Sequence, residues 1–310
     1  MAYGVGAGGI MGIALETVSG TYLAPTKYIP FNSESLQFMQ DTNFRRAIRN
    51  SPDVTFAVPG NAHTEGEIEM DAFDDIVPYF MNASRMDVVK TGAGPNYIYT
   101  GTPNALAVPA KTLSVTIVRD GIVFGYTGCV VGSFTFGIDD GTLTYTASIT
   151  GADEAVQTAP TPTWPTTTPF GAGQYNIEIP TTTTVTDVDT FEFGVEDNAE
   201  PQYRLKSTGR GANFIKFGER EVTLSLEKDF QTRTEYDAFK ALTAQSITLT
   251  ATKGLNNNIA ITAPVALKDT YEVNLDSQGD LVRASIEYQC LVGAATPSYT
   301  LVVKSQENIT

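Results

Sequence analysis

Polar and hydrophobic residues alternate along most of this chain, and this pattern predicts β-strands. Residues 113–117 alternate between aliphatic and hydroxyl side chains, and a longer β pattern follows over residues 123–138. Asp120-Gly121 and Asp140-Gly141 are typical of the hairpin turns that join such strands. The chain is therefore predicted to be mainly β.

Helical spacing of apolar residues marks two short segments. Over residues 72–83 the apolar side chains recur every three to four positions, and Pro78 within them predicts a short or kinked helix. A second stripe without proline lies over residues 235–244. Both stripes predict short helices that pack on a β-sheet.

The same order of elements occurs twice. A charged strand pattern at residues 67–71 precedes the first helix, and a similar one at residues 221–227 precedes the second. Each helix is followed by a short alternating strand, a longer hairpin with a Gly turn and a final strand. The matched landmarks are Glu67 with Glu221, Gly141 with Gly279, and Gly151 with Gly293. The repeat predicts two tandem β-sandwich units in a subunit of a symmetric assembly.

The boundaries of these units follow from composition. The first unit is predicted over residues 28–156 and the second, with a C-terminal tail, over residues 187–310. Residues 1–27 are Gly-rich and predict an arm that orders against a neighbour. Residues 157–186 are rich in Thr and Pro and predict a semi-extended connector, with Trp164 holding it to a surface.

The charge of the chain is strongly acidic. Its 310 residues include 35 acidic and 20 basic side chains, for a formal net charge of −15. This balance argues against nucleic acid as a surface-bound ligand, because phosphate affinity comes from Lys and Arg. It is compatible with a wall of like charge that keeps DNA from adhering, and also with a role in solubility alone.

Candidate catalytic chemistry is sparse. Cys129 and Cys290 lie in apolar strand patterns and predict buried thiols, and one histidine, His63, cannot build a metal cluster. The spacing Gly4-x-Gly6-x-x-Gly9 has no βαβ context that would make it a dinucleotide site. We therefore predict no enzyme, cofactor, metal or membrane span, and synthesis in the cytoplasm.

Two segments resemble tail tube proteins of long-tailed, non-contractile phages. Residues 12–26 carry a Glu-Thr, Gly-Thr and Pro-Thr phrase like the one before the first strand of those proteins. The second half is similar to their core over residues 191–193, 221–226, 236–239 and 281–288. No single motif carries this resemblance, which is distributed over most of the chain.

The resemblance implies how the units assemble. Each would be a β-sandwich with a flanking helix that contributes strands to a ring-shaped inner β-barrel, and stacked rings would form a tube. A family member with one unit forms hexameric rings, so a chain with two units would form a trimeric ring with pseudo-sixfold symmetry. The implied partners are other copies, the tape measure protein and DNA in the lumen, and tail terminator and baseplate proteins at the ends, all in the virion tail.

Candidate site residues follow from that assembly. Strand alternation nominates one acidic face for the lumen, although alternation does not distinguish the lumen from the exterior: Glu67, Glu69, Glu221 and Glu287. The basic patch before the loop predicted at residues 51–65, together with that loop and the arm, supplies candidate contacts between rings: Arg45, Arg46, Arg49, Pro59, His63 and Tyr22.

Two other functions compete with the tube. One is a carbohydrate-binding or adhesive β-sandwich, for which Tyr97, Tyr99 and Trp164 are the suggestive aromatic residues. The other is a tail component that forms a single ring, such as a terminator or a baseplate hub. Polymerisation into long tubes would distinguish a tail tube protein from both of these alternatives.

Overall fold

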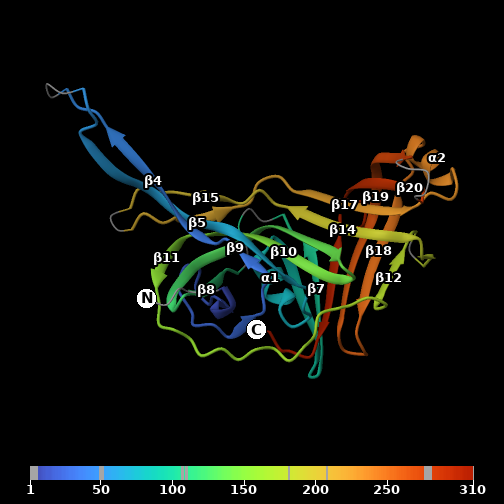
Figure 1. Cartoon of the computed structure of the whole chain (residues 1–310), viewed down its shortest axis with the longest axis horizontal. Helices are drawn as coiled ribbons and strands as arrows, with labels where there is room; N and C mark the ends of the chain where they lie inside the picture. Colours follow the sequence, from blue (N-terminus) through green and yellow to red (C-terminus); the bar gives the residue numbers. More distant parts are fainter. Residues whose placement is uncertain are drawn as a thin grey trace.

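The computed structural model of the chain describes residues 6–48, 52–105, 108, 111–180, 182–206, 209–275 and 281–309. The predicted contact residue Arg49 lies outside the described residues. The fold is mainly β, as predicted, and its strands form large antiparallel sheets with two short helices (Figure 1).

The main sheet runs through both halves of the chain. Its order begins with β3 and β4, both paired to β5, and continues through β10, β9, β14, β17 and β20 to β19. The strands are β3 (Ser33–Glu34), β4 (Gln37–Arg45), β5 (Phe56–Asp71), β10 (Thr142–Gly151), β9 (Ile122–Asp139), β14 (Val188–Glu196), β17 (Glu221–Asp229), β20 (Arg283–Cys290) and β19 (Asn258–Asn274).

A second layer covers the apolar side of this sheet in two parts. The first part has the order β2, β1, β8, β9 and β11, and the second has the order β13, β12, β18, β19, β21, β7 and β6. These strands are β1 (Ile10–Leu15), β2 (Lys27–Ile29), β6 (Met86–Ala93), β7 (Asn96–Pro103), β8 (Leu113–Arg119), β11 (Asp153–Val156), β12 (Tyr175–Glu178), β13 (Thr184–Val185), β18 (Gln245–Thr252) and β21 (Thr300–Ser305).

Strands β9 and β19 each belong to both layers. The N-terminal part of β9 pairs with β8 and its C-terminal part with β10, and β19 pairs with β18 and β20 in the same way. A long strand that passes from one sheet to the other closes one edge of a sandwich. Each half of the chain therefore has one such corner.

The pairings of the first half recur in the second half. In the first half they join β1–β2, β1–β8, β8–β9, β9–β10, β10–β5, β5–β4 and β9–β11. In the second they join β12–β13, β12–β18, β18–β19, β19–β20, β20–β17, β17–β14 and β19–β21. Both halves also have a bulge at the same two ladders, β8–β9 with β18–β19 and β9–β10 with β19–β20.

These bulges fix which residues correspond. In β9 the ladder to β10 omits Gly132, and in β19 the ladder to β20 omits Asp269. Counted from these bulges, Ser148 of β10 corresponds to Glu287 of β20. Glu67 lies opposite Ser148, and Ser225 lies opposite Glu287, so Glu67 corresponds to Ser225. The match of Glu67 with Glu221 from sequence is therefore wrong by four residues, because residue identity alone does not register a bulge.

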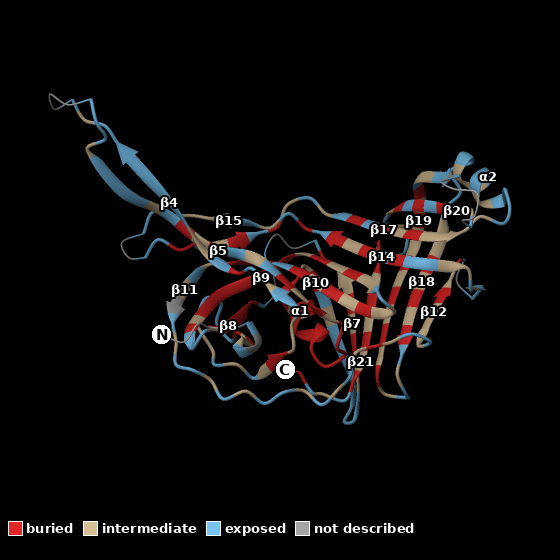
Figure 2. Cartoon of the chain, in the orientation of Figure 1, coloured by how far each residue is buried: buried red, intermediate tan, exposed pale blue. Residues whose placement is uncertain are grey.

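The two helices have different surroundings. α1 (Val77–Ala83) begins with Pro78 in its first turn, where the missing N–H costs nothing, and nearly all its side chains are buried. α2 (Thr234–Lys240) has no buried residue. Helix α2 thus lies at an end of the molecule where one face remains uncovered (Figure 2).

The core between the layers is aromatic. Tyr145 of β10 lies 4.9 Å from Phe136 and 5.5 Å from Phe80 of α1, measured between ring centroids. Phe193 of β14 and Tyr299 lie 5.5 Å apart in an edge-to-face contact. Phe134 of β9 joins these two groups, because its ring lies 6.4 Å from Phe193 and 6.2 Å from Tyr299 of the second half, so the halves share one continuous core.

The predicted N-terminal arm is largely part of the sandwich. β1 is buried and pairs with β8 over its full length, and β2 pairs with β1, so residues 10–29 are integral to the first half. The sequence prediction of an arm over residues 1–27 is wrong for this part, because the Gly-rich composition concealed the short aliphatic run of β1. The loop predicted at residues 51–65 is also wrong from Phe56 onward, where β5 begins.

Glu16, in the Glu-Thr step of the N-terminal segment, has a structural role. Its side chain is 6% exposed and has no basic partner among the described residues. One carboxylate oxygen accepts hydrogen bonds from Ser114 Oγ and Gly128 N, both at 2.9 Å. The other accepts from Gly20 N at 2.6 Å and Thr112 Oγ1 at 2.5 Å. Glu16 therefore ties the turn after β1 to β8 and β9.

Replacing Glu16 with Gln should reduce the free energy of unfolding by about 2–4 kcal/mol, since an amide donor would face backbone and hydroxyl donors inside the fold. Urea unfolding of the dissociated chain measures this loss. Glu192→Gln, on an exposed strand position, is the matched control and should change stability by less than about 0.5 kcal/mol. Equal stability of the two variants would contradict the role assigned to Glu16.

Candidate functional site

One surface of the main sheet is polar from end to end. Alternate residues of its strands point away from α1 and the second layer, and we call this surface the polar face. On β17, for example, Glu221 and Thr223 are exposed whereas Val222 and Leu224 are buried. The carboxylates of the polar face include Glu65, Glu67, Glu69, Asp71, Asp139, Glu192, Glu196, Glu221, Glu227, Asp229, Glu272 and Glu287.

The charge of the polar face is strongly negative. The ladder between β14 and β17 sets Glu196 directly opposite Glu221. On the described strands of this face, apart from the far end of β4 that carries Arg45, the one Lys or Arg side chain is Arg283, whose Nη1 lies 2.7 Å from Asp189 Oδ2 and 3.8 Å from Glu227 Oε1. Such a surface repels a phosphate backbone, and the repulsion grows as salt is lowered.

The four acidic residues predicted for the lumen all lie on the polar face. Glu67, Glu221 and Glu287 are exposed, and Glu69 is half-buried and accepts a hydrogen bond of 2.9 Å from the Ser33 hydroxyl. Between the carboxylate-bearing strands lie β9 and β10, whose polar-face residues are mainly Ser and Thr. The face therefore combines carboxylates with short hydroxyl side chains.

The basic patch lies on a projecting hairpin. The described residues 41–48 and 52–62, at the end of β4 and the start of β5, form this hairpin, which we call the arm hairpin and which extends from the body of the molecule (Figure 1). Arg45, Arg46 and Pro59 are exposed on it. Their predicted contacts with another ring remain predictions.

Two other predicted contact residues have partners within the chain. His63 Nδ1 lies 2.9 Å from the Tyr203 hydroxyl, and His63 Nε2 lies 3.2 Å from a Glu65 carboxylate oxygen. The Tyr22 hydroxyl lies 2.8 Å from Thr116 Oγ1 of β8. Both residues therefore hold parts of this chain together.

The main sheet ends in two unlike edges. At one edge β3 and β4 pair with β5 alone, and at the other the C-terminal part of β19 pairs with β20 alone, among the described residues. Between β3 and β4 the Leu36 carbonyl accepts hydrogen bonds from Tyr126 and Arg119, so this one group is satisfied within the chain. At the second edge Val273 is 37% exposed.

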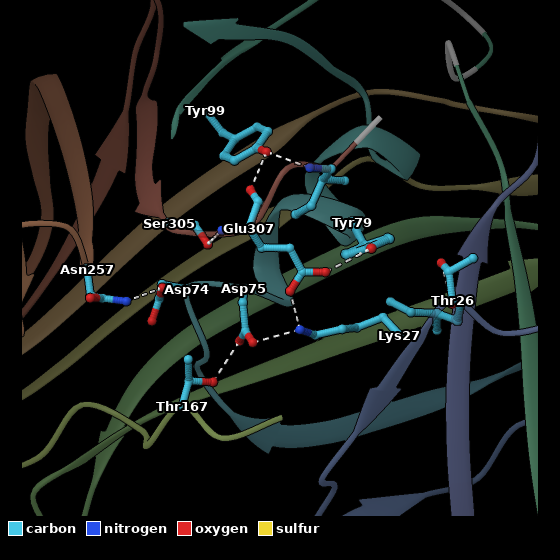
Figure 3. Close-up of polar contacts among 12 residues, drawn as sticks. Thr26, Lys27, Asp74, Asp75, Tyr79, Tyr99, Thr167, Asn257, Ser305 and Glu307 are labelled. Atoms are coloured by element: carbon cyan, nitrogen blue, oxygen red, sulfur yellow. Dashed lines mark hydrogen bonds and ion pairs between the residues drawn. The ribbon is translucent and has the colours of Figure 1, made fainter. Parts of the chain in front are cut away.

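A polar cluster inside the molecule joins distant segments (Figure 3). Lys27 of β2 binds Asp75 at 2.7 Å and also binds Glu307 after β21. Burial by itself lowers the pKa of Lys27, but its hydrogen bonds to Asp75 and Glu307 outweigh this and raise the pKa above its usual value. Thr167 of the connector donates a hydrogen bond of 3.0 Å to Asp75. The cluster thus fastens the connector and the C-terminal segment to the first half.

Asp74 is the most deeply buried acid of this cluster. It accepts a 2.6 Å hydrogen bond from Asn257 Nδ2, its other oxygen has no hydrogen-bond partner, and Lys253 Nζ lies 3.7 Å away. Burial raises the pKa of the Asp74 carboxyl above its usual value. The folded chain therefore binds a proton at Asp74 more tightly than the unfolded chain does, and stability due to this group falls as pH rises through the folded pKa.

Asp74→Asn should therefore leave the protein at least as stable as wild type at pH 8, since the amide removes the cost of a buried charge. The difference in melting temperature between variant and wild type should shrink as pH falls toward 4. Thermal unfolding at a series of pH values measures both curves. The exposed control Asp139→Asn should have the melting temperature of wild type at every pH. If the melting temperature of Asp74→Asn relative to wild type were lower at pH 8 than at pH 4, this assignment would be contradicted.

Sites for metal or redox chemistry are not evident in the described part of the chain. No group of three or more His, Cys, Asp or Glu side chains there is arranged to hold a metal ion. Cys129 and Cys290 are buried free thiols, and burial raises the pKa of Cys290 to about 12. None of the helices in the described residues has the length and apolar character that crossing a membrane requires.

Comparison with known proteins identifies the family of the chain. A family model described as phage tail tube protein matches residues 6–290. No curated protein matches the chain. The family match spans both halves, the connector and the arm hairpin.

Proposed function

The chain belongs to the phage tail tube protein family, and on that premise we propose that three copies close each ring of the tube with pseudo-sixfold symmetry. The protein is a structural component that assembles with itself in the virion tail. Because members of this family are structural, a non-enzymatic role is indicated.

The observation that carries the proposal is the junction between the two halves. β9, at the end of the first half of the sheet, pairs with β14, at the start of the second half. Phe136 lies opposite Phe193 there, and both are fully buried. The free edge at β4 corresponds to β14, and the free edge at β19 corresponds to β9. A junction like that of β9 with β14 would therefore form between β19 of one copy and β4 of the next, and it would continue the sheet.

The internal junction also supplies a register for the junction between copies. Ser133 and Phe134 of β9 lie opposite Glu196 and Val195 of β14. Counting from the bulges, the equivalent pairing places Phe38 of one copy opposite Tyr271 of the next. Gln37 then lies opposite Glu272 on the polar face, and the apolar residues remain on the inner side. Both edges thus have matching patterns.

Ring closure with two units per chain favours three copies. A head-to-tail contact between unlike edges generates a ring when the rotation closes, and it leaves no edge of the main sheet unpaired. Six similar units then surround the channel, two from each chain. We propose internal duplication as the origin of this arrangement, supported by the recurrent ladders and bulges.

The polar face is proposed to line the lumen. Its carboxylates and hydroxyl groups extend over the whole main sheet, which is the surface that would continue from copy to copy. A negatively charged wall lets DNA and the tape measure protein pass without phosphate binding. Terminator and baseplate proteins would cap the tube ends.

Negative-stain microscopy of the purified protein tests this function. Long tubes with a stain-filled channel are expected after concentration. Isolated rings would favour a terminator or hub, and a stable monomer that binds glycans would favour the adhesive function. Either of these results would overturn the tube proposal.

A further inference from the structure

The second half contains a close counterpart of the arm hairpin. β15 (Glu200–Gln202) and β16 (Phe214–Lys216) form a hairpin between β14 and β17, as the arm hairpin does between β4 and β5. Glu200, Pro201 and Gln202 lie opposite Lys216, Ile215 and Phe214. Asn43, Phe44 and Arg45 lie opposite Val58, Ala57 and Phe56. The two hairpins therefore match residue by residue.

The hairpin of the second half packs against the first half. Ala212, Ile215 and Phe217 form a small buried cluster with Val130 of β9, against which Ala152 also packs. Ala212 N donates a 3.0 Å hydrogen bond to the Ala152 carbonyl. This hairpin therefore covers the middle of β9 and the end of β10 in the neighbouring half.

The arm hairpin has apolar residues at the positions that are buried in its counterpart, and here they are exposed. Val54, Ala57 and Pro59 are the counterparts of Ala212, Ile215 and Phe217; Val54 is 46% exposed, and Phe44, opposite Ala57, is 67% exposed. Figure 2 shows the arm hairpin exposed over most of its length. In Figure 1 the arm hairpin, at the ends of β4 and β5, extends toward the same side of the molecule as the hairpin labelled β15. Apolar side chains in such numbers on a projecting hairpin indicate an interface.

The second half has an uncovered surface at the matching place. Counting along β10 and β20 makes Leu291 and Val292 the counterparts of Ala152 and Asp153, and they are 38% and 76% exposed. Leu291 N donates to the Val265 carbonyl at 2.8 Å, much as Ala152 N donates to the Thr127 carbonyl at 2.8 Å. The backbone there has the form that the β15–β16 hairpin covers in the first half.

Charge also matches between the two surfaces. Tyr203 of the β15–β16 hairpin contacts His63 of the first half. The same counting makes Arg46 the counterpart of Tyr203 and Glu221 the counterpart of His63. Where Tyr203 meets His63 within the chain, the arm hairpin therefore carries the basic Arg46 and the second half carries the exposed acidic Glu221.

We infer that the arm hairpin packs on the second half of the adjacent copy in the same ring, over Leu291 and Val292, with Arg46 beside Glu221. The occupant of the Leu291–Val292 surface is therefore a second copy of this chain. The contact rests on the proposed ring, and it assigns Arg46 to a contact within a ring instead of one between rings.

Disulfide trapping tests this contact with Val54→Cys and Leu291→Cys in one chain. These residues are the counterparts of Ala212 and Ala152, whose backbones are hydrogen-bonded, so the paired thiols lie within disulfide range. Tubes are oxidised and then dissociated in detergent without reductant. Each copy carries one new cysteine on the arm hairpin and one on the Leu291–Val292 surface, so disulfides within a ring of three link at most three chains. A gel run without reductant should then show a ladder of monomer, dimer and trimer bands that ends at the covalent trimer.

The outcomes separate this inference from the proposed function. A ladder that ends at six would support the contact within a ring and overturn the three-copy ring. Bands that continue past six linked chains would place the arm hairpin between rings. Well-formed tubes that show no linked chains would mean that the contact does not exist. Either result overturns the inference. Absence of tubes in wild type would instead overturn the proposed function. Wild type and the pair Val54→Cys with Leu255→Cys, in the β18–β19 turn, should give no ladder.

A charge exchange keeps the inference testable if the cysteine variants fail to assemble. Arg46→Glu should raise the critical concentration for tube formation about fivefold, as expected for loss of one partly exposed ion pair. Adding Glu221→Arg should restore it toward the wild-type value. A double variant no better than Arg46→Glu would contradict the proposed pair.

Discussion

Val273→Lys is expected to abolish ring formation and leave a folded monomer. Val273 lies on the free edge of β19 and is the counterpart of Phe136, which is fully buried at the internal junction. A lysine there would have to enter an apolar seam, and lysine on an edge strand is a common device that prevents edge-to-edge pairing. Since 37% of Val273 is exposed in the single chain, the monomer should keep its fold.

Sedimentation velocity distinguishes the outcomes. Val273→Lys should sediment as the 33.3 kDa chain at concentrations where wild type forms rings and tubes. Leu255→Lys, at a residue that is 95% exposed in a turn away from both edges, is the matched control and should assemble normally. Tubes of Val273→Lys with normal appearance would show that β19 is not at the seam.

Reversing charge on the polar face is expected to slow DNA passage and leave tubes intact. Glu67→Lys with Glu287→Lys places two lysines per chain on the surface proposed to line the lumen. Lysine would bind phosphate with release of counterions, so DNA that passes a repulsive wall would instead encounter attractive sites. We expect ejection to slow on the order of tenfold in low salt, and less as salt is raised.

Phage particles assembled with this variant allow the measurement by time-resolved release of DNA. The matched control reverses Asp120 and Asp237, which are exposed in a turn and on α2, away from the polar face. The control should eject at the wild-type rate. Normal ejection by the polar-face variant in intact tubes would contradict the lumen assignment.

Short-range patterns in the sequence were enough for the fold class. The alternation at residues 113–117 and the turn Asp120-Gly121 correspond to β8 and the start of β9. The two apolar stripes correspond to α1 and α2. Each of these features depends on neighbouring residues, for which periodicity is a direct physical signal.

Long-range features needed the structure. The buried strand β1 was concealed by glycine, and the arm hairpin read as a loop because Pro59 and Gly60 interrupt its β pattern. Gly60 is tolerated there because β4 approaches closely: an added Cβ would lie 2.8 Å from Asp41 Cβ. The match of Glu67 to Ser225 likewise depends on bulges, which are set by pairing across the sheet.

The candidate site was predicted in part. Acidic alternation placed Glu67, Glu69, Glu221 and Glu287 together because strand residues two apart share a face. Glu192 and Glu196 on the same face were missed, although the phrase Phe191-Glu192-Phe193 carries the same alternation. The free edges had no sequence signal, since which strand ends a sheet depends on the whole topology.

Cryo-electron microscopy of tubes tests the central claim most directly, namely that two sheet-forming units of each chain build a ring of three. The account predicts three copies per ring around a continuous inner sheet, with β19 of one copy beside β4 of the next. It also predicts carboxylates of the polar face on the channel wall. Six copies per ring, or a seam that leaves β19 unpaired, would contradict it.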